Sequence, residues 1–233
     1  MDFIRNPIIL ALDVDSRDEA FGILDRIGGI VGAVKLGPRL VYRYGAQLVT
    51  EVATIAPVFV DNKYFDISST MVAAVRATFD AGATLVTVHA LAGSAALKEL
   101  ALLEKELNKL RPFRILAVTI LTSWEQSALP AGFQPWPIKN HVQSLANEAL
   151  TAGLNGLVCS GHELEFLNRP EVFKVVPGIR LATEGGLAED QKRIMSPAQA
   201  MQAGASALVI GRPILRSKNP KETVLEILES CAK

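Results

Sequence analysis

Short apolar stretches recur along the chain, separated by longer segments in which hydrophobic and polar residues are mixed. Each stretch is apolar through its middle, which is typical of parallel strands that are covered on both faces. Eight stretches are predicted as strands: Ile8–Leu12, Ala33–Leu36, Val58–Val60, Leu85–His89, Ile115–Ile120, Gly156–Cys159, Lys174–Val176 and Ala207–Ile210. Helical patterns lie between most of them, so the chain is predicted to be a series of strand–helix units.

Signals for helix ends support this series. Glu19 lies three residues after Ser16, the spacing of a capping box, and Ser196–Gln199 and Asn219–Glu222 open two later helices similarly. Three helices are predicted to end at a glycine shortly before a strand: Gly82, Gly153 and Gly204. The intervals between these glycines are unequal, which argues against a solenoid.

Eight strand–helix units in 233 residues fit a single-domain (β/α)8 TIM barrel over residues 1–233. The alternative is an open doubly wound sheet, but no Gly-x-Gly-x-x-Gly follows the first strand. Two segments are poor in regular structure. Ser123–Pro137 is predicted as a loop after the fifth strand, and Leu181–Asp190, after the seventh, is a candidate lid.

Composition narrows the function. Hydrophobic residues make up 49% of the chain, enough for a large core, and 24 Lys and Arg balance 24 Asp and Glu. This balance disfavours nucleic acid as a partner. Cys159 and Cys231 are too few for a disulfide framework or a cysteine metal site. No apolar run has the length of a membrane span and no targeting segment precedes the barrel, so we expect a cytoplasmic protein.

The third predicted strand is followed directly by the charged residues Asp61, Lys63 and Asp66. Catalytic residues of such barrels come from the carboxyl ends of strands, and charges there are costly unless they are paired. Asp61 and Lys63 are two residues apart, so their side chains are predicted to share one side of the strand. The alternative is a purely structural salt bridge in the barrel mouth.

The other strand ends supply further polar residues: Asp13, Lys35, His89, Thr122, Ser123 and Arg180. Each of these residues, taken by itself, could equally have a structural role beside its strand. His89 is predicted to be packed or hydrogen-bonded at the rim, because no second histidine lies near it in the sequence to complete a metal site. No metal site is predicted.

The regions after the last two strands indicate a phosphate site, because these loops frequently bind phosphate in TIM barrels. They carry Arg180, Gln191, Gly211 and Arg212. A guanidinium can hold two phosphate oxygens, and the backbone of a glycine can approach them closely. A phosphorylated small molecule is the implied substrate.

These motifs together resemble a known family. The segment from Asp61 to Thr70 is similar to the active-site signature of orotidine 5′-phosphate decarboxylases. Other blocks follow in the family's order over nearly the whole chain: Leu-Ala-Leu-Asp13, Val-Lys35-Leu-Gly, Val-Thr-Val-His89, Leu-Thr122-Ser123, Pro-Gly-Ile-Arg180, Asp-Gln191 and Ile-Gly211-Arg212. Ser68 stands where the family motif commonly has proline, and Leu181–Glu189 differs from the family's usual forms.

The resemblance implies decarboxylation of orotidine 5′-monophosphate to uridine 5′-monophosphate, the last step of de novo pyrimidine biosynthesis, without metal or organic cofactor. It implies that Lys63 is the proton donor and that Lys35, Asp61, Lys63 and Asp66 form an alternating charged chain. A homodimer with shared active sites is also implied. By the same resemblance, Asp13 and Lys35 would bind the ribose, and Thr122 and Ser123 would contact the pyrimidine. Gln191 and Arg212 would bind the phosphate. Asp66, Ile67 and Thr70 would reach into the active site of the neighbouring subunit.

Two alternatives remain at this point. A Mg²⁺-dependent 3-keto-gulonate-6-phosphate decarboxylase or hexulose-phosphate synthase shares the Asp-x-Lys-x-x-Asp spacing. These enzymes carry an acidic residue near the end of strand two, where this chain has Lys35, and a lysine repels a divalent cation. Ile67 also fits the nucleotide branch better. A catalytically silent metabolite-binding barrel is the second alternative, and it would have no need for the charged array.

Overall fold

The computed structural model describes residues 3–180 and 195–232, and it shows a closed barrel of eight parallel strands. Each strand pairs with its sequence neighbours, and β8 closes on β1, where Leu10 lies opposite Ile210. The strands are β1 (Ile8–Ala11), β2 (Ala33–Leu36), β3 (Val58–Tyr64), β4 (Ala83–His89), β5 (Arg114–Val118), β6 (Gly156–Val158), β7 (Phe173–Val176) and β8 (Ala207–Ile210). The predicted barrel and its eight strands are confirmed.

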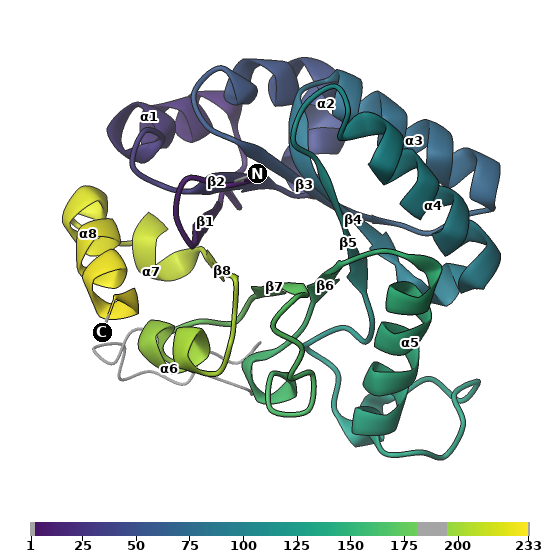
Figure 1. Cartoon of the computed structure of the whole chain (residues 1–233). Helices are drawn as coiled ribbons and strands as arrows, with labels where there is room; N and C mark the ends of the chain where they lie inside the picture. The colour runs from purple at the N-terminus through teal and green to yellow at the C-terminus, as the bar shows by residue number, and fades with distance from the viewer. Residues whose placement is uncertain (1–2, 181–194, 233) are drawn as a thin grey trace.

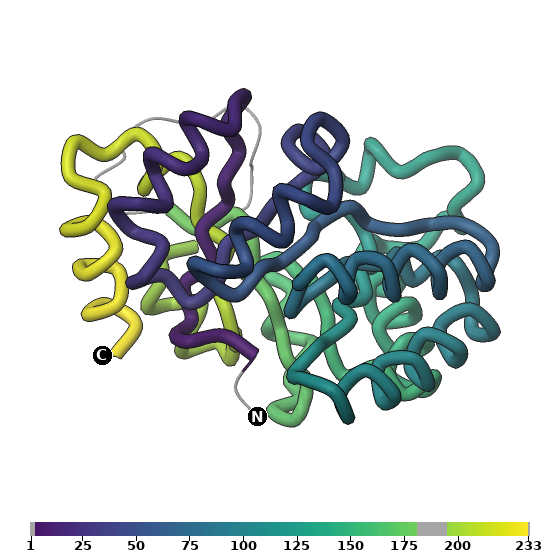
Figure 2. Tube along the Cα trace, turned by 90° about the horizontal axis from the view of Figure 1, so that it is seen from above, coloured from purple at the N-terminus to yellow at the C-terminus, as the bar shows by residue number. Residues whose placement is uncertain are grey.

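Helices surround the ring of strands, and the yellow helix α8 returns to lie beside the purple α1 (Figures 1 and 2). They are α1 (Arg17–Ile27), α2 (Pro38–Ala53), α3 (Ser68–Asp80), α4 (Gly93–Leu107), α5 (Ile138–Ala152), α6 (Pro197–Gln202), α7 (Arg212–Leu215) and α8 (Pro220–Cys231). Short 3-10 turns are η1 (Ala90–Ala92), η2 (Gln126–Ala128) and η3 (Gly161–Glu163).

The predicted helix ends are confirmed. The side chains of Ser16, Ser196 and Asn219 each accept a hydrogen bond from the backbone N–H three residues later, which satisfies one of the free donors of a helix start. The three predicted glycines, at positions 82, 153 and 204, have φ angles of 110°, 104° and 94°. This left-handed region suits glycine, and it lets the chain turn from a helix into the next strand.

The predicted boundary of the third strand was wrong. The apolar pattern stops at Val60, but β3 continues to Tyr64, which pairs with Val88 of β4. Polar side chains at positions 61–63 ended the pattern without ending the strand. Asp61 and Lys63 therefore belong to the barrel wall itself, whereas Asp66 follows it. The other strands match their predicted bounds to within two residues.

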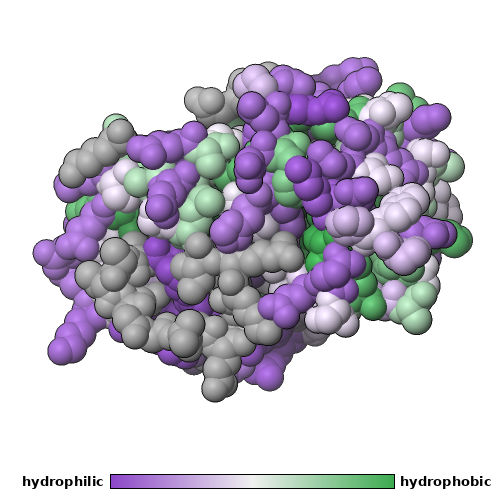
Figure 3. Space-filling view, turned by 90° about the horizontal axis from the view of Figure 1, so that it is seen from below, coloured by the Kyte–Doolittle hydropathy of each residue, from purple (hydrophilic) through white to green (hydrophobic). Residues whose placement is uncertain are grey.

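The core has two layers, one between the strands and the helices and one inside the barrel. The inner layer is filled by Ile9, Ala11, Ala33, Phe59, Leu85, Leu116, Val175, Ala207 and Val209. The barrel is thus a packed core rather than a pore, and a cavity can form only above this layer. Outside, hydrophilic side chains predominate among the coloured residues of the face shown in Figure 3, with smaller apolar areas between them.

Within residues 3–180 and 195–232, no helix combines the length and apolar character that a bilayer crossing requires. Cys159 is buried and Cys231 half-buried, and neither is in a disulfide. The candidate lid, Leu181–Asp190, and the predicted phosphate ligand Gln191 lie outside the described residues.

Candidate active site

A cavity of about 660 Å³ opens at the carboxyl ends of the strands. Its floor is apolar and includes side chains of the inner core layer, among them Ala11, Phe59, Val175 and Val209. Nine residues that the sequence singled out line it: Asp13, Lys35, Asp61, Lys63, Thr122, Ser123, Arg180, Gly211 and Arg212. The fold therefore gathers residues that lie up to 199 positions apart (13 to 212) into one concave site.

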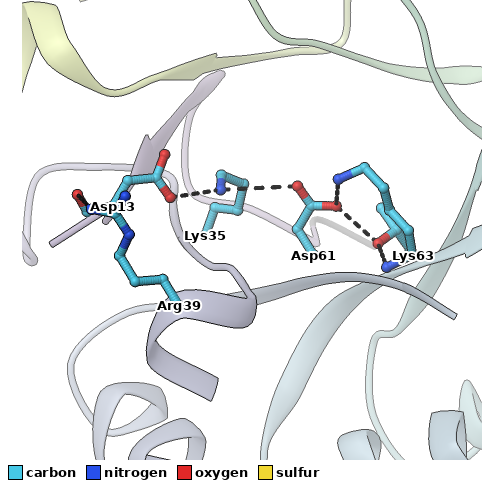
Figure 4. Close-up of polar contacts among 6 residues, drawn as sticks. Asp13, Lys35, Arg39, Asp61 and Lys63 are labelled. Carbon is cyan, nitrogen blue, oxygen red and sulfur yellow. Dashed lines mark hydrogen bonds and ion pairs between the residues drawn. The ribbon is translucent and has the colours of Figure 1, made fainter. Parts of the chain in front are cut away.

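Four of these residues form a continuous chain of alternating charge across β1, β2 and β3 (Figure 4). Lys35 Nζ lies 3.1 Å from Asp13 Oδ1 and 3.9 Å from Asp61 Oδ2. Asp61 Oδ1 accepts a hydrogen bond of 2.9 Å from Lys63 Nζ. Each carboxylate touches at least one ammonium, which compensates for the loss of hydration inside the cavity.

Exposure rises from the centre of this chain to its ends. The side chains of Lys35 and Asp61 are 11% and 16% exposed, whereas those of Lys63 and Asp13 are 38% and 54% exposed. The two central charges are thus held by the barrel, and the two outer ones face the space that a ligand would occupy.

The contact between Asp61 and Lys63 was predicted, and it forms in an irregular part of β3. Between Val60 and Tyr64 the pairing of β3 with β4 shifts register, and Lys63 has a φ of 49°. Lys63 is the one non-glycine residue with positive φ in the described part of the chain. Such conformations cost free energy and concentrate at functional sites.

Thr87 of β4 was missed by the sequence analysis. Its hydroxyl donates to Asp61 Oδ1 at 2.9 Å and accepts the backbone N–H of Lys63 at 2.8 Å. The signal was present, because Thr87 is a polar residue inside the apolar run Leu85–Val88.

His89 is packed at the rim, as predicted. Its Nδ1 accepts the N–H of Leu91 at 3.3 Å, and its ring lies 5.6 Å from that of Phe65. Burial lowers the pKa of His89, and the positive charge of Lys63 lowers it further. The imidazole is therefore neutral near pH 7, and the cavity is lined without it.

Arg180, Gly211 and Arg212 all line the cavity, as the predicted phosphate site requires. Gly211 passes close to β1, because a Cβ at this position would lie 3.2 Å from the Cβ of Ala11. A side chain at this position would require Ala11 to move by a few tenths of an ångström. Arg212 begins α7 immediately after this close approach.

Asp66, Ile67 and Thr70 lie apart from the cavity of their own chain. Asp66 Oδ1 accepts the N–H of Ile67 at 2.6 Å, and all three residues are exposed. The side chains of Ile67 and Phe65 are among the most exposed large apolar ones, at 70% and 61%. The predicted extension of the charged chain to Asp66 is not made within one subunit.

Among the described residues, no group of three or more His, Cys, Asp or Glu side chains could hold a metal ion. Asp13 and Asp61 are the nearest candidates, but the ammonium of Lys35 lies between them. A cation in that place repels Mg²⁺, so the donor set does not fit a divalent ion.

Comparisons with known proteins agree with the geometry. The model of the orotidine 5′-phosphate decarboxylase / HUMPS family matches residues 6–227. The chain belongs to this family. An orotidine 5′-phosphate decarboxylase from Rhodopseudomonas palustris (strain BisB5) is 39% identical over 232 residues, which cover 98% of this chain and 95% of that protein. One from Erythrobacter litoralis is 37% identical over 227 residues, covering 96% and 98%.

A solved structure shows the same fold. The crystal structure of orotidine 5′-phosphate decarboxylase from Lactobacillus acidophilus superposes with a TM-score of 0.85 at 30% identity, and the match covers 98% of this chain and all of that one. The resemblance read from the motifs is confirmed, and so is the barrel as the family's architecture in this chain.

Ser68, the departure from the decarboxylase motif, occupies the first position of α3. Its hydroxyl donates a short hydrogen bond to the carboxylate of Glu99 on α4. Proline suits a first helical position, because its fixed φ fits the helix and the missing N–H has no helical partner there. Serine preserves the same helix start and adds a link to α4.

Proposed function

We propose that this protein decarboxylates orotidine 5′-monophosphate to uridine 5′-monophosphate and CO₂, the last step of de novo pyrimidine biosynthesis, with Lys63 as the proton donor. Membership of the family and relatives named for this activity support the reaction. The observation that carries the assignment of Lys63 is the chain Asp13–Lys35–Asp61–Lys63, which ends in a partly exposed ammonium inside the cavity.

The chemistry needs a cation beside C6 of the pyrimidine. Loss of CO₂ leaves an electron pair on a carbon with little delocalisation, and an ammonium stabilises this charge as it forms. The same ammonium then donates a proton to C6, which completes the product. Asp61 orients the Lys63 ammonium, because its Oδ1 accepts a hydrogen bond of 2.9 Å from Lys63 Nζ.

Asp61 has a second proposed role. It lies next to the ammonium, and the departing carboxylate of the substrate would therefore face a negative charge in the ground state. This repulsion disappears as CO₂ leaves, so it lowers the barrier without strengthening substrate binding. Lys35 holds Asp61 in place from the other side, at 3.9 Å.

The rest of the cavity accommodates the nucleotide. Asp13 and Lys35 bind the ribose hydroxyls, Thr122 and Ser123 contact the pyrimidine, and Arg212 binds the phosphate with Arg180 and the backbone of Gly211. Gln191 is proposed as a further phosphate ligand. The apolar floor takes the face of the base. Binding energy from the phosphate can then align the base against Lys63.

We also propose a homodimer with shared sites, in which Asp66, Ile67 and Thr70 reach the partner's cavity. Their exposure outside the cavity of their own chain supports this, as do the exposed apolar side chains of Phe65 and Ile67. Mixing tests it. Lys63→Ala and Asp66→Ala protomers, each inactive alone, should regain activity when unfolded and refolded together, because one of the two mixed sites contains both native residues. Persistent inactivity of a verified mixed dimer would contradict the shared site.

The reaction is tested by incubating the purified protein with orotidine 5′-monophosphate in the presence of a chelator. Loss of substrate absorbance and appearance of uridine 5′-monophosphate are expected. Activity that requires added Mg²⁺ would favour the sugar-phosphate enzymes, which Lys35 already disfavours. Tight nucleotide binding without turnover would indicate a silent binding barrel. Cytoplasmic localisation stays a prediction, to be checked by cell fractionation.

A further inference from the structure

The irregular part of β3 is organised around a single side chain of the neighbouring strand. Val60 pairs with Val86, and the next pair is Tyr64 with Val88. Three residues of β3, 61–63, thus lie opposite one residue of β4, Thr87. A regular ladder cannot pair three residues with one, so the backbone groups of this stretch need other partners.

Thr87 supplies one of these partners, for the Lys63 N–H, from a fully buried position. Its side chain is 0% exposed, and its hydroxyl both accepts the Lys63 N–H at 2.8 Å and donates to Asp61 Oδ1 at 2.9 Å. One hydroxyl therefore joins the backbone of Lys63 to the carboxylate of Asp61. The same Oδ1 accepts the Lys63 ammonium at 2.9 Å, which closes a small ring of contacts.

We propose that Thr87 is a positioning residue for the decarboxylation, which holds Lys63 in its left-handed backbone conformation and orients Asp61 toward the Lys63 ammonium. This inference rests on the function proposed above. Thr87 is not among the residues that line the cavity, so it acts through the two charged residues and not on the substrate.

The physical reason lies in the cost of the Lys63 conformation. A φ of 49° is unfavourable for a lysine, and it persists only where surrounding contacts hold it. Without the hydroxyl, the Lys63 N–H is buried without its partner and Asp61 loses one of its two donors to Oδ1. Both residues then gain freedom, and the ammonium leaves the position that the reaction needs. Small displacements of a catalytic group reduce the rate strongly.

The test compares Thr87→Val, which keeps the shape and removes the hydroxyl, with Thr87→Ser, which keeps the hydroxyl. Thr119→Val is the matched control, because Thr119 is also 0% exposed and its hydroxyl has no partner among the described residues. For each protein, kcat and KM for orotidine 5′-monophosphate are measured at a temperature well below its thermal midpoint. Thr87→Cys is prepared as well, in case the valine variant does not fold.

We expect Thr87→Val to lower kcat by about tenfold to a hundredfold while KM changes by less than about threefold, since the loss concerns alignment rather than binding. Thr87→Ser should recover most of kcat, and Thr119→Val should match the wild type. A folded Thr87→Val protein with wild-type kcat would overturn the proposal, as would a loss confined to KM. Failure of both the valine and cysteine variants to fold would also overturn it, because the hydroxyl would then be structural. If the wild type itself does not decarboxylate the nucleotide, the proposed function fails instead.

Discussion

Glu104 gives the structure a pH dependence that can be measured directly. This residue lies on α4, and its Oε2 accepts the backbone N–H of Ile115 at the start of β5 over 2.6 Å. Burial raises the pKa of Glu104 from 4.5 to about 7, although the hydrogen bond from Ile115 and the charges of Arg114 and Lys105 act in the opposite direction. Between about pH 4.5 and 7, the folded protein therefore keeps a proton on Glu104 that the unfolded chain releases.

The sign and size of the effect follow from linkage. Because the folded pKa is raised, the contribution of Glu104 to stability is fully present below about pH 4.5 and is lost as the pH rises through about 7. A difference of about 2.5 pKa units corresponds to about 3 kcal/mol of unfolding free energy, at 1.36 kcal/mol per unit. Glu104→Gln keeps an oxygen acceptor for the Ile115 N–H and cannot ionise, so its free energy of unfolding does not fall with pH for this reason.

The assay is urea unfolding of both proteins at several pH values between 4.5 and 8.5. The stability of Glu104→Gln relative to the wild type should rise with pH, by up to about 3 kcal/mol. Glu106→Gln is the control on the same helix, because Glu106 is exposed and the hydrogen bond from Arg76 lowers its pKa below the usual 4.5. Glu106 is therefore ionised in both the folded and the unfolded state over most of this range, and the stability difference between Glu106→Gln and the wild type should stay nearly constant. A difference between Glu104→Gln and the wild type that stays constant with pH would refute the reasoning.

Three further predictions concern the site. Lys63→Ala should bind the nucleotide yet form almost no product in the decarboxylation assay, and near-normal turnover would contradict the mechanism. Arg212→Ala should raise KM and also lower kcat, since phosphate binding aligns the base; unchanged kinetics would place the phosphate elsewhere. Ser68→Pro should retain activity, and its free energy of unfolding should exceed that of Ser68→Ala by about 0.4–1 kcal/mol. Both variants lack the Glu99 contact, and Ile67 already has the extended conformation that the residue before a proline prefers. Thermal and urea unfolding would measure the last difference.

The sequence determined the architecture to within a few residues. Short continuous apolar stretches are typical of strands covered on both faces, and the capping signals at Ser16, Ser196 and Asn219 mark helices that cover them. These are local properties, so they can be read along the chain. The charged segment after Val60, and the arginine after the eighth strand, also indicated the catalytic face, because the carboxyl ends of all parallel strands meet there.

The tertiary structure decided how those charges are arranged. The contact of Asp13 with Lys35 depends on the register between β1 and β2, and barrel closure brings Arg212 to the same cavity. The irregular stretch of β3 that carries Asp61 and Lys63 depends on a shift in strand pairing that no periodicity reveals, because the alternation rule assumes a regular strand. Thr87 holds that shift in place from another strand, through hydrogen bonds that exist only once β3 and β4 are paired. The residue types of the site are thus local information, while the geometry that makes them reactive comes from partners distant in the sequence.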